Sequence, residues 1–374
     1  MVLASRETDS LWMQRALALA ARGEGRTSPN PPVGAVVVRD NVVIGEGYHR
    51  KAGKPHAEVL ALRGLSRNDT QGAALYVTLE PCSTVGRTPA CTDAIMAAGI
   101  RRVVVSVKDP NPKHAGRGLR ILRRHGIQVS TGVCRREGAA LLAPFCKWIT
   151  TGRPYVTLKM AMTLDGRIAD AHHRSKWITG AAARRDVQRL RRRVDAVLVG
   201  AGTAAADDPS LLIKGRSSRQ PMRVVLDGKD RIPAGAKVLQ DGYPTTVVVT
   251  EDCSPARIAA LSQPAVHVWR CGKNRRVDVA LLLDRLGEAG HLHVLCEGGG
   301  ELAGELLRAK SVDVCRFYVA GRLLGGNGIG VSGSAGWNLG EEPRFRFADV
   351  RRLGQDVCLV AEPDDRLESL CSQD

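Results

Sequence analysis

Aromatic residues are scarce in this chain, at only 4% of its 374 residues. Proteins that hold single-stranded nucleic acid use aromatic rings as stacking platforms for the bases, so the scarcity argues against that class. The chain also lacks any apolar run approaching the roughly 18 residues that a membrane-spanning helix needs. We therefore expect no membrane-spanning segment.

Acidic residues are also too few to balance the basic ones: 38 Asp and Glu face 55 Lys and Arg, which gives a net charge of +17. The basic residues are spread along the chain and form no tail. Phosphorylated metabolites explain such a charge as well as nucleic acid does. Together with the few aromatic residues, this favours small phosphorylated substrates and no nucleic-acid partner.

The ten cysteines lack the regular, dense spacing of a disulfide framework. We expect them to be thiols in a reducing compartment, where any functional cysteine is a metal ligand or a nucleophile. Residues 9–17 form a polar-capped, amphipathic pattern that is typical of a first helix and lacks the basic flank of a signal peptide. These features predict a cytoplasmic protein.

Strand and helix signals run through the chain in two series, which meet near Gly152. The first series has a hairpin over residues 33–44, helices after His56 and Pro89, and strands at 74–79, 102–106 and 127–129. The second has strands at 155–160, 196–200, 223–227, 245–250, 266–269 and 293–296. Strands that alternate with helices predict layered α/β domains, the first with a mostly parallel sheet. We place the domains at residues 1–152 and 153–374.

Four residues of the first half form a metal-site pattern. His56 and Glu58 lie at the start of a predicted helix, Cys82 closes a predicted strand, and Cys91 follows. One imidazole and two thiolates are a common ligand set for catalytic zinc, with the fourth position open for water. Glu58 is spaced to face that water as a proton shuttle. Each residue alone has an ordinary structural explanation, but the combination is typical of zinc nucleobase deaminases, although eight residues instead of two separate the cysteines.

The longer spacing matches one family. Residues 78–91 read TLEPCSTVGRTPAC, which resembles the corresponding stretch of the bifunctional riboflavin biosynthesis deaminase–reductases. Further similar stretches are 30–34, 45–49, 52–58, 109–112 and 116–118. The resemblance extends over nearly the whole chain.

The resemblance implies a cytidine-deaminase-like three-layer α/β/α domain, followed by a dihydrofolate-reductase-like α/β domain. It makes His56, Cys82 and Cys91 the ligands of one Zn²⁺ per chain and Glu58 the general acid/base. It also implies that Asn30, His49 and Arg87 contact the substrate, although a solvated loop charge is an equal explanation of Arg87. Thr84 stands where the family has histidine, so we expect altered substrate contacts there.

In the second half, residues 159–169 and 175–180 resemble the reductase half of the family, and a glycine-rich turn follows the strand at 293–296. Such a turn at a helix start suits a dinucleotide pyrophosphate, although three glycines alone are weak evidence. The resemblance implies NADPH as cofactor. The implied cofactor contacts are Ala161, Trp177, Thr203, Asp207, Gly299, Gly300, Glu301, Leu302, Ala303, Gly304 and Glu305. The implied substrate contacts are Lys159, Ser175, Arg191, Leu211, Lys214 and Glu297, with Lys159 close to the reacting carbon.

The helix predicted after Gly180 carries an apolar face and a strongly basic face. Most of its arginines have a solvated face as their simplest explanation. By resemblance Arg191 is the exception and contacts the phosphate or ribityl chain.

Two other functions fit part of the pattern. One is a nucleic-acid deaminase of the tRNA-adenosine type with an accessory binding domain, against which the cysteine spacing argues. The other is a regulatory binding protein with a structural zinc, which would normally show four protein ligands. The leading hypothesis is the bifunctional enzyme, which we expect to be a homo-oligomer, a dimer or a tetramer.

Overall fold

The computed structural model describes residues 6–84, 89–112, 114–217 and 219–364. The chain divides into two compact units, Met1–Arg153 and Pro154–Asp374, which are described separately below. The division lies beside the junction placed at Gly152.

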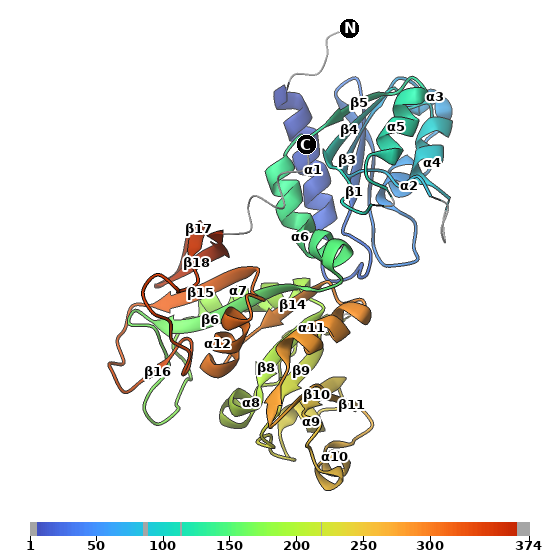
Figure 1. The fold of residues 1–374 in the computed structure, drawn as a ribbon. Helices are drawn as coiled ribbons and strands as arrows, with labels where there is room; N and C mark the ends of the chain where they lie inside the picture. The colour runs from blue at the N-terminus through green and yellow to red at the C-terminus, as the bar shows by residue number, and fades with distance from the viewer. Residues whose placement is uncertain (1–5, 85–88, 113, 218, 365–374) are drawn as a thin grey trace. The chain divides into compact units, whose positions relative to one another are not determined.

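The first unit is built on a five-stranded sheet in the order β2-β1-β3-β4-β5 (Figure 1). Strands β1 (Gly34–Arg39) and β2 (Val42–Tyr48) form the predicted hairpin, and Asp40 and Asn41 both have positive φ in its tight turn. Strands β3 (Ala74–Leu79), β4 (Arg102–Val107) and β5 (Gln128–Thr131) are parallel. Only β1 runs against the other four strands, so the sheet is mostly parallel.

Helices cover both faces of this sheet, because alternate residues of its strands are buried on opposite sides. Helices α1 (Arg6–Ala21) and α6 (Arg135–Thr151) pack on the face that carries Val36, Tyr76 and Val104. Helices α2 (Ala57–Leu62), α4 (Cys91–Ala97) and α5 (Arg117–Arg124) pack on the other face, and α3 (Arg67–Thr70) follows α2. The result is a three-layer α/β/α unit (Figure 1). Helix α6, whose interior contains Pro144, was not predicted from the sequence.

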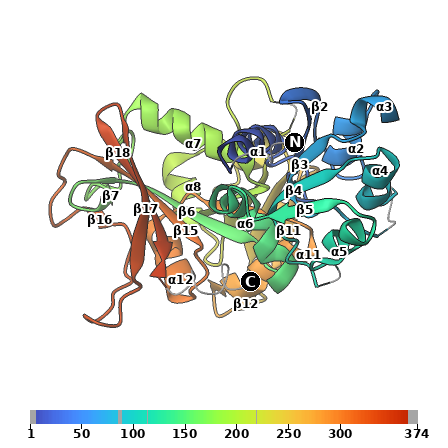
Figure 2. The ribbon, with the colours of Figure 1, turned by 90° about the horizontal axis from the view of Figure 1, so that it is seen from above.

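The second unit has a nine-stranded sheet in the order β11-β10-β9-β8-β14-β6-β15-β18-β17. The strands from β11 to β15 are parallel, and β18 and β17 add an antiparallel edge (Figure 2). Their bounds are β6 (Tyr155–Thr163), β8 (Ala196–Gly200), β9 (Met222–Leu226), β10 (Thr245–Val249), β11 (Val266–Arg270), β14 (His293–Cys296), β15 (Val314–Ala320), β17 (Phe345–Leu353) and β18 (Asp356–Pro363). Two small pairs lie outside it: β7 (Arg167–Ala169) with β16 (Ile329–Gly330), and β12 (Gly272–Lys273) with β13 (Arg276–Val277).

Two hydrophobic clusters hold the helices of this unit to the sheet. One contains residues of α7 (Ala181–Arg193), α8 (Ala201–Asp207), α9 (Lys237–Gln240) and α10 (Pro255–Leu261). The other contains residues of α11 (Val279–Glu288) and α12 (Gly300–Arg308). Because the crossovers bury both faces, the central strands are apolar throughout, as Val197–Val199 and Val247–Val249 illustrate.

Across the described ranges, no helix has the length and apolar character needed to cross a bilayer.

Candidate active sites

The predicted metal ligands lie together in the first unit. His56 directly precedes α2, Cys82 follows β3, and Cys91 begins α4. The His56 Nδ1 atom lies 3.2 Å from Cys91 Sγ and 3.5 Å from Cys82 Sγ, and the two sulfurs are 3.3 Å apart. Zinc bonds of about 2.0 Å to nitrogen and 2.3 Å to sulfur place tetrahedral ligand atoms roughly 3.5–3.8 Å apart. The three residues therefore fit a zinc ion.

Glu58 lies in the first turn of α2 and is only 4% exposed. Burial, reinforced by the neighbouring Cys82 thiolate, raises the pKa of Glu58 to about 7. A carboxyl group with such a pKa can both accept and donate a proton near neutral pH, which is what a proton shuttle requires.

The buried carboxylate of Glu80 fixes the backbone beside the metal site through hydrogen bonds. Glu80 accepts hydrogen bonds from the backbone N–H groups of Asp109, Gly116 and Gly118, at 3.3, 2.9 and 2.9 Å. A Cβ atom at Gly118 would lie 2.2 Å from the Pro81 carbonyl oxygen, so only glycine lets α5 begin this close to the end of β3. Glu80 was not among the predicted site residues, although a carboxylate at the end of an apolar strand is an available signal.

Two of the predicted substrate residues lie beside the metal site. The His49 ring packs edge-on against the His56 ring, with centroids 5.4 Å apart. Burial lowers the pKa of His49, which keeps the ring neutral. With its Nδ1–H donating to the Pro55 carbonyl at 3.1 Å, His49 accepts at Nε2 from the Asn30 amide, also at 3.1 Å. Arg87 lies outside the described residues, and Thr84 is exposed.

The second unit contains a cleft of about 2130 Å³ at the carboxyl ends of its parallel strands. All six predicted substrate residues and nine of the predicted cofactor residues line it. These are Lys159, Ser175, Arg191, Leu211, Lys214 and Glu297, and Ala161, Trp177, Thr203, Asp207, Gly299, Gly300, Glu301, Leu302 and Glu305. The structure does not bring Ala303 and Gly304 to the cleft. Ala303 is buried in the core, and Gly304 packs against the turn at Ser332, because they lie on other sides of α12.

Three charged residues meet on the cleft wall. Lys159 on β6 lies beside Glu297, which follows the neighbouring strand β14, and Arg191 on α7 pairs with Glu297. Although burial alone would raise the pKa of Glu297, Arg191 and Lys159 hold it below its ordinary value. Burial lowers the pKa of Lys159, whereas Glu297 opposes that shift. The wall therefore presents a fixed carboxylate beside an amine that gives up its proton more readily than an ordinary lysine.

Arg191 is buried and already paired, unlike the solvated arginines around it. Its Nε and one terminal nitrogen donate to the two Glu297 oxygens at 2.5 and 2.9 Å, and the other terminal nitrogen donates to the Leu212 carbonyl at 2.8 Å. Of the five guanidinium N–H groups, two have no protein partner in the described part of the chain. Any contact with substrate is limited to these two groups.

Other predicted residues contact one another at the cleft mouth. The Ser175 hydroxyl donates to Asp207 at 2.6 Å, which joins a predicted substrate residue to a predicted cofactor residue. Trp177 is 60% exposed, and the Arg184 guanidinium lies 4.7 Å above its ring. An exposed indole held in this way offers a flat apolar surface to a bound ring.

Two protein-family models match this chain, one in each unit. A model described as the RibD C-terminal domain matches residues 154–359, which is more than half of the chain. The chain belongs to the RibD family. A second model, the cytidine and deoxycytidylate deaminase zinc-binding region, matches residues 6–107 and thus includes all three predicted ligands.

Individual RibD proteins are similar along their full length. Riboflavin biosynthesis protein RibD of Escherichia coli is 42% identical, and the alignment covers 94% of this chain and 98% of the relative. The structure of Acinetobacter baumannii RibD has 40% identity and a TM-score of 0.84, with 96% and 99% of the two chains covered. A Thermotoga maritima structure described as a diaminohydroxyphosphoribosylaminopyrimidine deaminase/5-amino-6-(5-phosphoribosylamino)uracil reductase has 36% identity and a TM-score of 0.87, with 96% and 99% covered.

These matches confirm the predicted family, fold class and cofactors, which are zinc in the deaminase domain and NADPH in the RibD reductase domain. They contradict the nucleic-acid alternative, because the second half matches the RibD reductase domain where that alternative needs an accessory binding domain. The individual site residues remain predictions.

Proposed function

We propose that this chain catalyses two successive reactions of riboflavin biosynthesis. The first unit deaminates 2,5-diamino-6-(5-phosphoribosylamino)pyrimidin-4(3H)-one, and the second reduces the ribosyl group of the resulting 5-amino-6-(5-phosphoribosylamino)uracil to ribityl with NADPH. The supporting observation is that one RibD-family chain carries the His56, Cys82 and Cys91 cluster beside a buried Glu58, and also the Lys159-lined cleft.

In the deaminase half, zinc held by His56, Cys82 and Cys91 supplies Lewis acidity and activates water at neutral pH. Glu58 takes the proton that water releases as it adds to the amino-bearing ring carbon, and returns a proton to the departing amino group. The shifted pKa of Glu58, about 7, suits both transfers. Asn30 and His49 orient the pyrimidine, and Arg87 is the predicted contact of its phosphate.

In the reductase half, NADPH supplies the hydride that reduces C1′ of the sugar. A ring-opened imine at C1′ is the acceptor that fits the chemistry, and its nitrogen needs a proton. Lys159, close to the reacting carbon by family resemblance, orients the imine or protonates it. Glu297 opposes the loss of the proton of Lys159, and Arg191 keeps Glu297 ionised. The two open N–H groups of Arg191, together with Lys214, then hold the phosphorylated end of the substrate by charge-assisted hydrogen bonds.

We also propose a cytoplasmic homo-oligomer, a dimer or a tetramer, that does not bind nucleic acid. Strand β17 lies at the sheet edge and exposes Phe347 and Val350, which are 66% and 59% accessible. An exposed edge strand with apolar side chains favours pairing with another chain. Light scattering on the purified protein measures the mass directly.

One assay separates the two activities. The protein is incubated with the diamino substrate and NADPH, and ammonia release and NADPH oxidation are followed separately. We expect both signals from the unmodified chain, loss of both in Cys91→Ser, and loss of NADPH oxidation alone in Lys159→Met. Supplying the deaminated intermediate restores NADPH oxidation in Cys91→Ser. Absence of either signal in the unmodified chain contradicts the proposal for that half.

A further inference from the structure

One wall of the reductase cleft is an irregular segment that joins α8 to β9. Asp208, Ser210, Leu211 and Lys214 of this segment all line the cleft. Asp208 and Leu211 adopt positive φ angles of 40° and 57°, although neither is glycine. Such a conformation is unfavourable for a leucine, and it persists only where the surroundings impose it. The shape of this wall must therefore be held by side chains that bond to the segment, from within it or from other elements.

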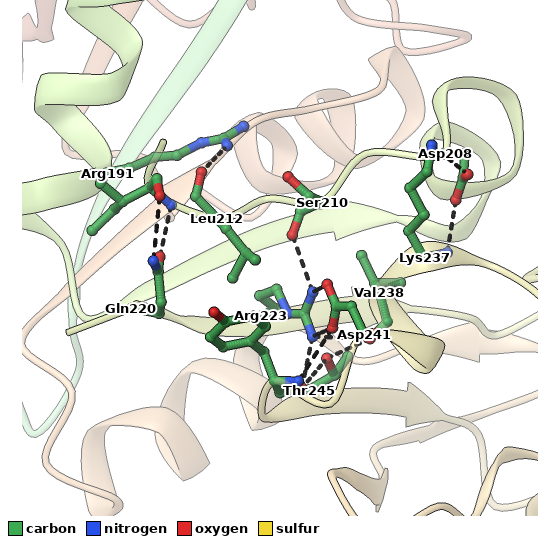
Figure 3. A network of polar contacts seen from close by, with 12 residues as sticks. Arg191, Asp208, Ser210, Leu212, Gln220, Arg223, Lys237, Val238, Asp241 and Thr245 are labelled. Atoms are coloured by element: carbon green, nitrogen blue, oxygen red, sulfur yellow. Dashed lines mark hydrogen bonds and ion pairs between the residues drawn. The ribbon is translucent and has the colours of Figure 1, made fainter. Parts of the chain in front are cut away.

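Most of those contacts reach backbone atoms of the segment. The Gln220 amide oxygen accepts from the Ile213 N–H at 2.7 Å, and the Gln188 amide oxygen accepts from the Lys214 N–H at 2.8 Å. At the start of the segment, the Asp208 carboxylate accepts from the Lys237 backbone N–H at 2.8 Å and pairs with its amine at 3.0 Å. The Leu212 carbonyl is held by Arg191, as described above. Figure 3 shows several of these contacts around the segment.

A further anchor is Arg223 on β9, whose side chain is fully buried and does not line the cleft. One terminal nitrogen donates to the Ser210 carbonyl at 3.1 Å, just before Leu211. The other donates to the Val238 and Tyr243 carbonyls at 3.1 and 2.6 Å, and both contact the Asp241 carboxylate at 2.7 Å (Figure 3). The guanidinium group of Arg223 thus connects the cleft wall at Ser210 to Val238, Asp241 and Tyr243, which follow β9 in the chain.

Stability alone does not account for this arginine. Its Nε–H is buried without a partner among the described residues, and burial of an ion pair costs desolvation that an apolar residue would avoid. Its neighbours on the strand, Val224 and Val225, are fully buried valines. A lysine cannot replace this guanidinium group, because its single amine nitrogen cannot bond to Ser210 and to both Asp241 oxygens as two planar nitrogens do.

We propose that Arg223, fixed by Asp241, is a positioning residue of the reductase. It sets the backbone at Ser210 so that Leu211 and Lys214 meet the phosphorylated substrate. The inference rests on the reductase function proposed above. Because Arg223 acts on the substrate wall and not on the glycine-rich turn at Gly299, it affects the substrate and leaves the cofactor unaffected.

The test is Arg223→Lys in the full chain, assayed with the deaminated intermediate and NADPH. We expect KM for the pyrimidine to rise at least about tenfold, because a small displacement of the residues that bind the substrate weakens its binding strongly. KM for NADPH and the rate of ammonia release should change less than about twofold, because the glycine-rich turn at Gly299 and the deaminase residues belong to other segments of the chain.

Arg219→Lys is the matched control. Arg219, just before β9, also pairs with a buried carboxylate, Asp195, at 2.8 Å, but it does not line the cleft. Its substitution should lower the melting temperature without changing KM for the pyrimidine. Equal KM values in the two lysine variants would overturn the proposal, and so would a loss of active protein in Arg223→Lys at unchanged KM.

Asp241→Asn provides a milder second variant, because Asp241 is 26% exposed and asparagine keeps its shape. If Arg223→Lys does not fold, a rise in KM for the pyrimidine in Asp241→Asn supports the proposal, and an unchanged KM contradicts it. If the unmodified chain does not reduce the intermediate, the proposed reductase function fails instead.

Discussion

Two buried glutamates illustrate how surroundings set the role of a single residue. Burial raises the pKa of Glu58 to about 7, and the Cys82 thiolate adds to that shift. Glu297 is also enclosed, but Arg191 and Lys159 hold its pKa below the ordinary value. The first carboxyl group can exchange a proton near neutral pH, whereas the second stays ionised. One residue type thus serves as a proton shuttle in one unit and as a fixed anion in the other.

Glu58→Gln should stop ammonia release while leaving the metal in place. Glutamine fits the same space but cannot accept the proton, so we expect a loss on the order of 10²–10⁴-fold. Metal analysis should still find one zinc per chain, and NADPH oxidation with supplied intermediate should be unchanged. Glu46→Gln, at a carboxylate on β2 that pairs with Arg15, is the control and should be active. Normal deamination by Glu58→Gln would refute the role given to this residue.

The lowered pKa of Lys159 predicts an alkaline limit on reduction. Desolvation in the cleft wall makes Lys159 lose its proton at a pH below the ordinary value of 10.5, so a step that needs the protonated amine slows as pH rises through the lowered pKa. Lys159→Arg retains its proton and should therefore lose this alkaline decline, even if its rate is lower at every pH. Stopped-flow or steady-state NADPH oxidation across alkaline pH measures the profile. Lys273→Arg, at an exposed position, should keep the decline. An unchanged profile in Lys159→Arg would count against proton donation by Lys159.

Arg191→Ala should damage substrate binding far more than Arg192→Ala or Arg193→Ala. Its removal leaves the Glu297 carboxylate buried without its bidentate partner and frees the Leu212 carbonyl. Loss of charged hydrogen bonds of this kind costs roughly 10–100-fold, which should appear in KM for the pyrimidine. NADPH binding and ammonia release should hardly change. Steady-state kinetics on the three variants checks this, and equal effects would indicate a diffuse basic field in place of a specific contact.

Local spacing explains which residue-level predictions were possible. The metal ligands follow short motifs around His56 and Cys82, so their meeting in space was predictable from sequence. The partner of Arg191 was not, because Glu297 lies 106 residues away on a different element. The role of Arg223 was not predictable for the same reason. It depends on contacts with Ser210 and Asp241, which only the folded sheet brings together.

At the scale of elements, strands and turns with strong local signals were predictable. The strand at Ala74–Leu79 and the hairpin before it agree with the sequence analysis, because β-branched runs and an Asp-Asn turn are local features. Helix α6 was not predicted because Pro144 interrupts its helical sequence pattern. Its apolar face is stabilised by packing against α1 and β4, which the local sequence does not reveal. Strands β17 and β18 pair with each other in a local hairpin, and β18 joins the sheet by pairing with β15, which lies earlier in the chain.

Gly118→Ala tests how closely α5 must approach the metal-bearing strand end. The added methyl group would lie 2.2 Å from the Pro81 carbonyl, so either the helix or Cys82 must shift. We expect lower zinc occupancy and at least about tenfold slower deamination, because a ligand is displaced. Arg120→Ala, on the exposed side of the same helix, is the control. If zinc content and deamination are normal in Gly118→Ala, the packing of α5 on Pro81 does not set the metal site.

At the scale of the whole molecule, the chain carries two cores that do not share a sheet. The clusters of Met1–Arg153 and those of Pro154–Asp374 contain only residues of their own unit. The two family models match on opposite sides of this point, at residues 6–107 and 154–359. Each unit therefore has the hydrophobic core and the complete candidate site that an independent domain requires.

Residues 1–153 and 154–374, expressed separately, should each fold and retain one activity. The first fragment keeps His56, Cys82, Cys91 and Glu58, so it should bind one zinc and release ammonia from the diamino substrate. The second keeps the whole cleft and should oxidise NADPH with the deaminated intermediate. Circular dichroism melts, metal analysis and the two assays check these outcomes, and a mixture of the fragments should convert the diamino substrate through both steps. If neither fragment folds while the intact chain does, each core depends on the other unit. A fragment that folds but is inactive would instead show that its site needs groups from the other half.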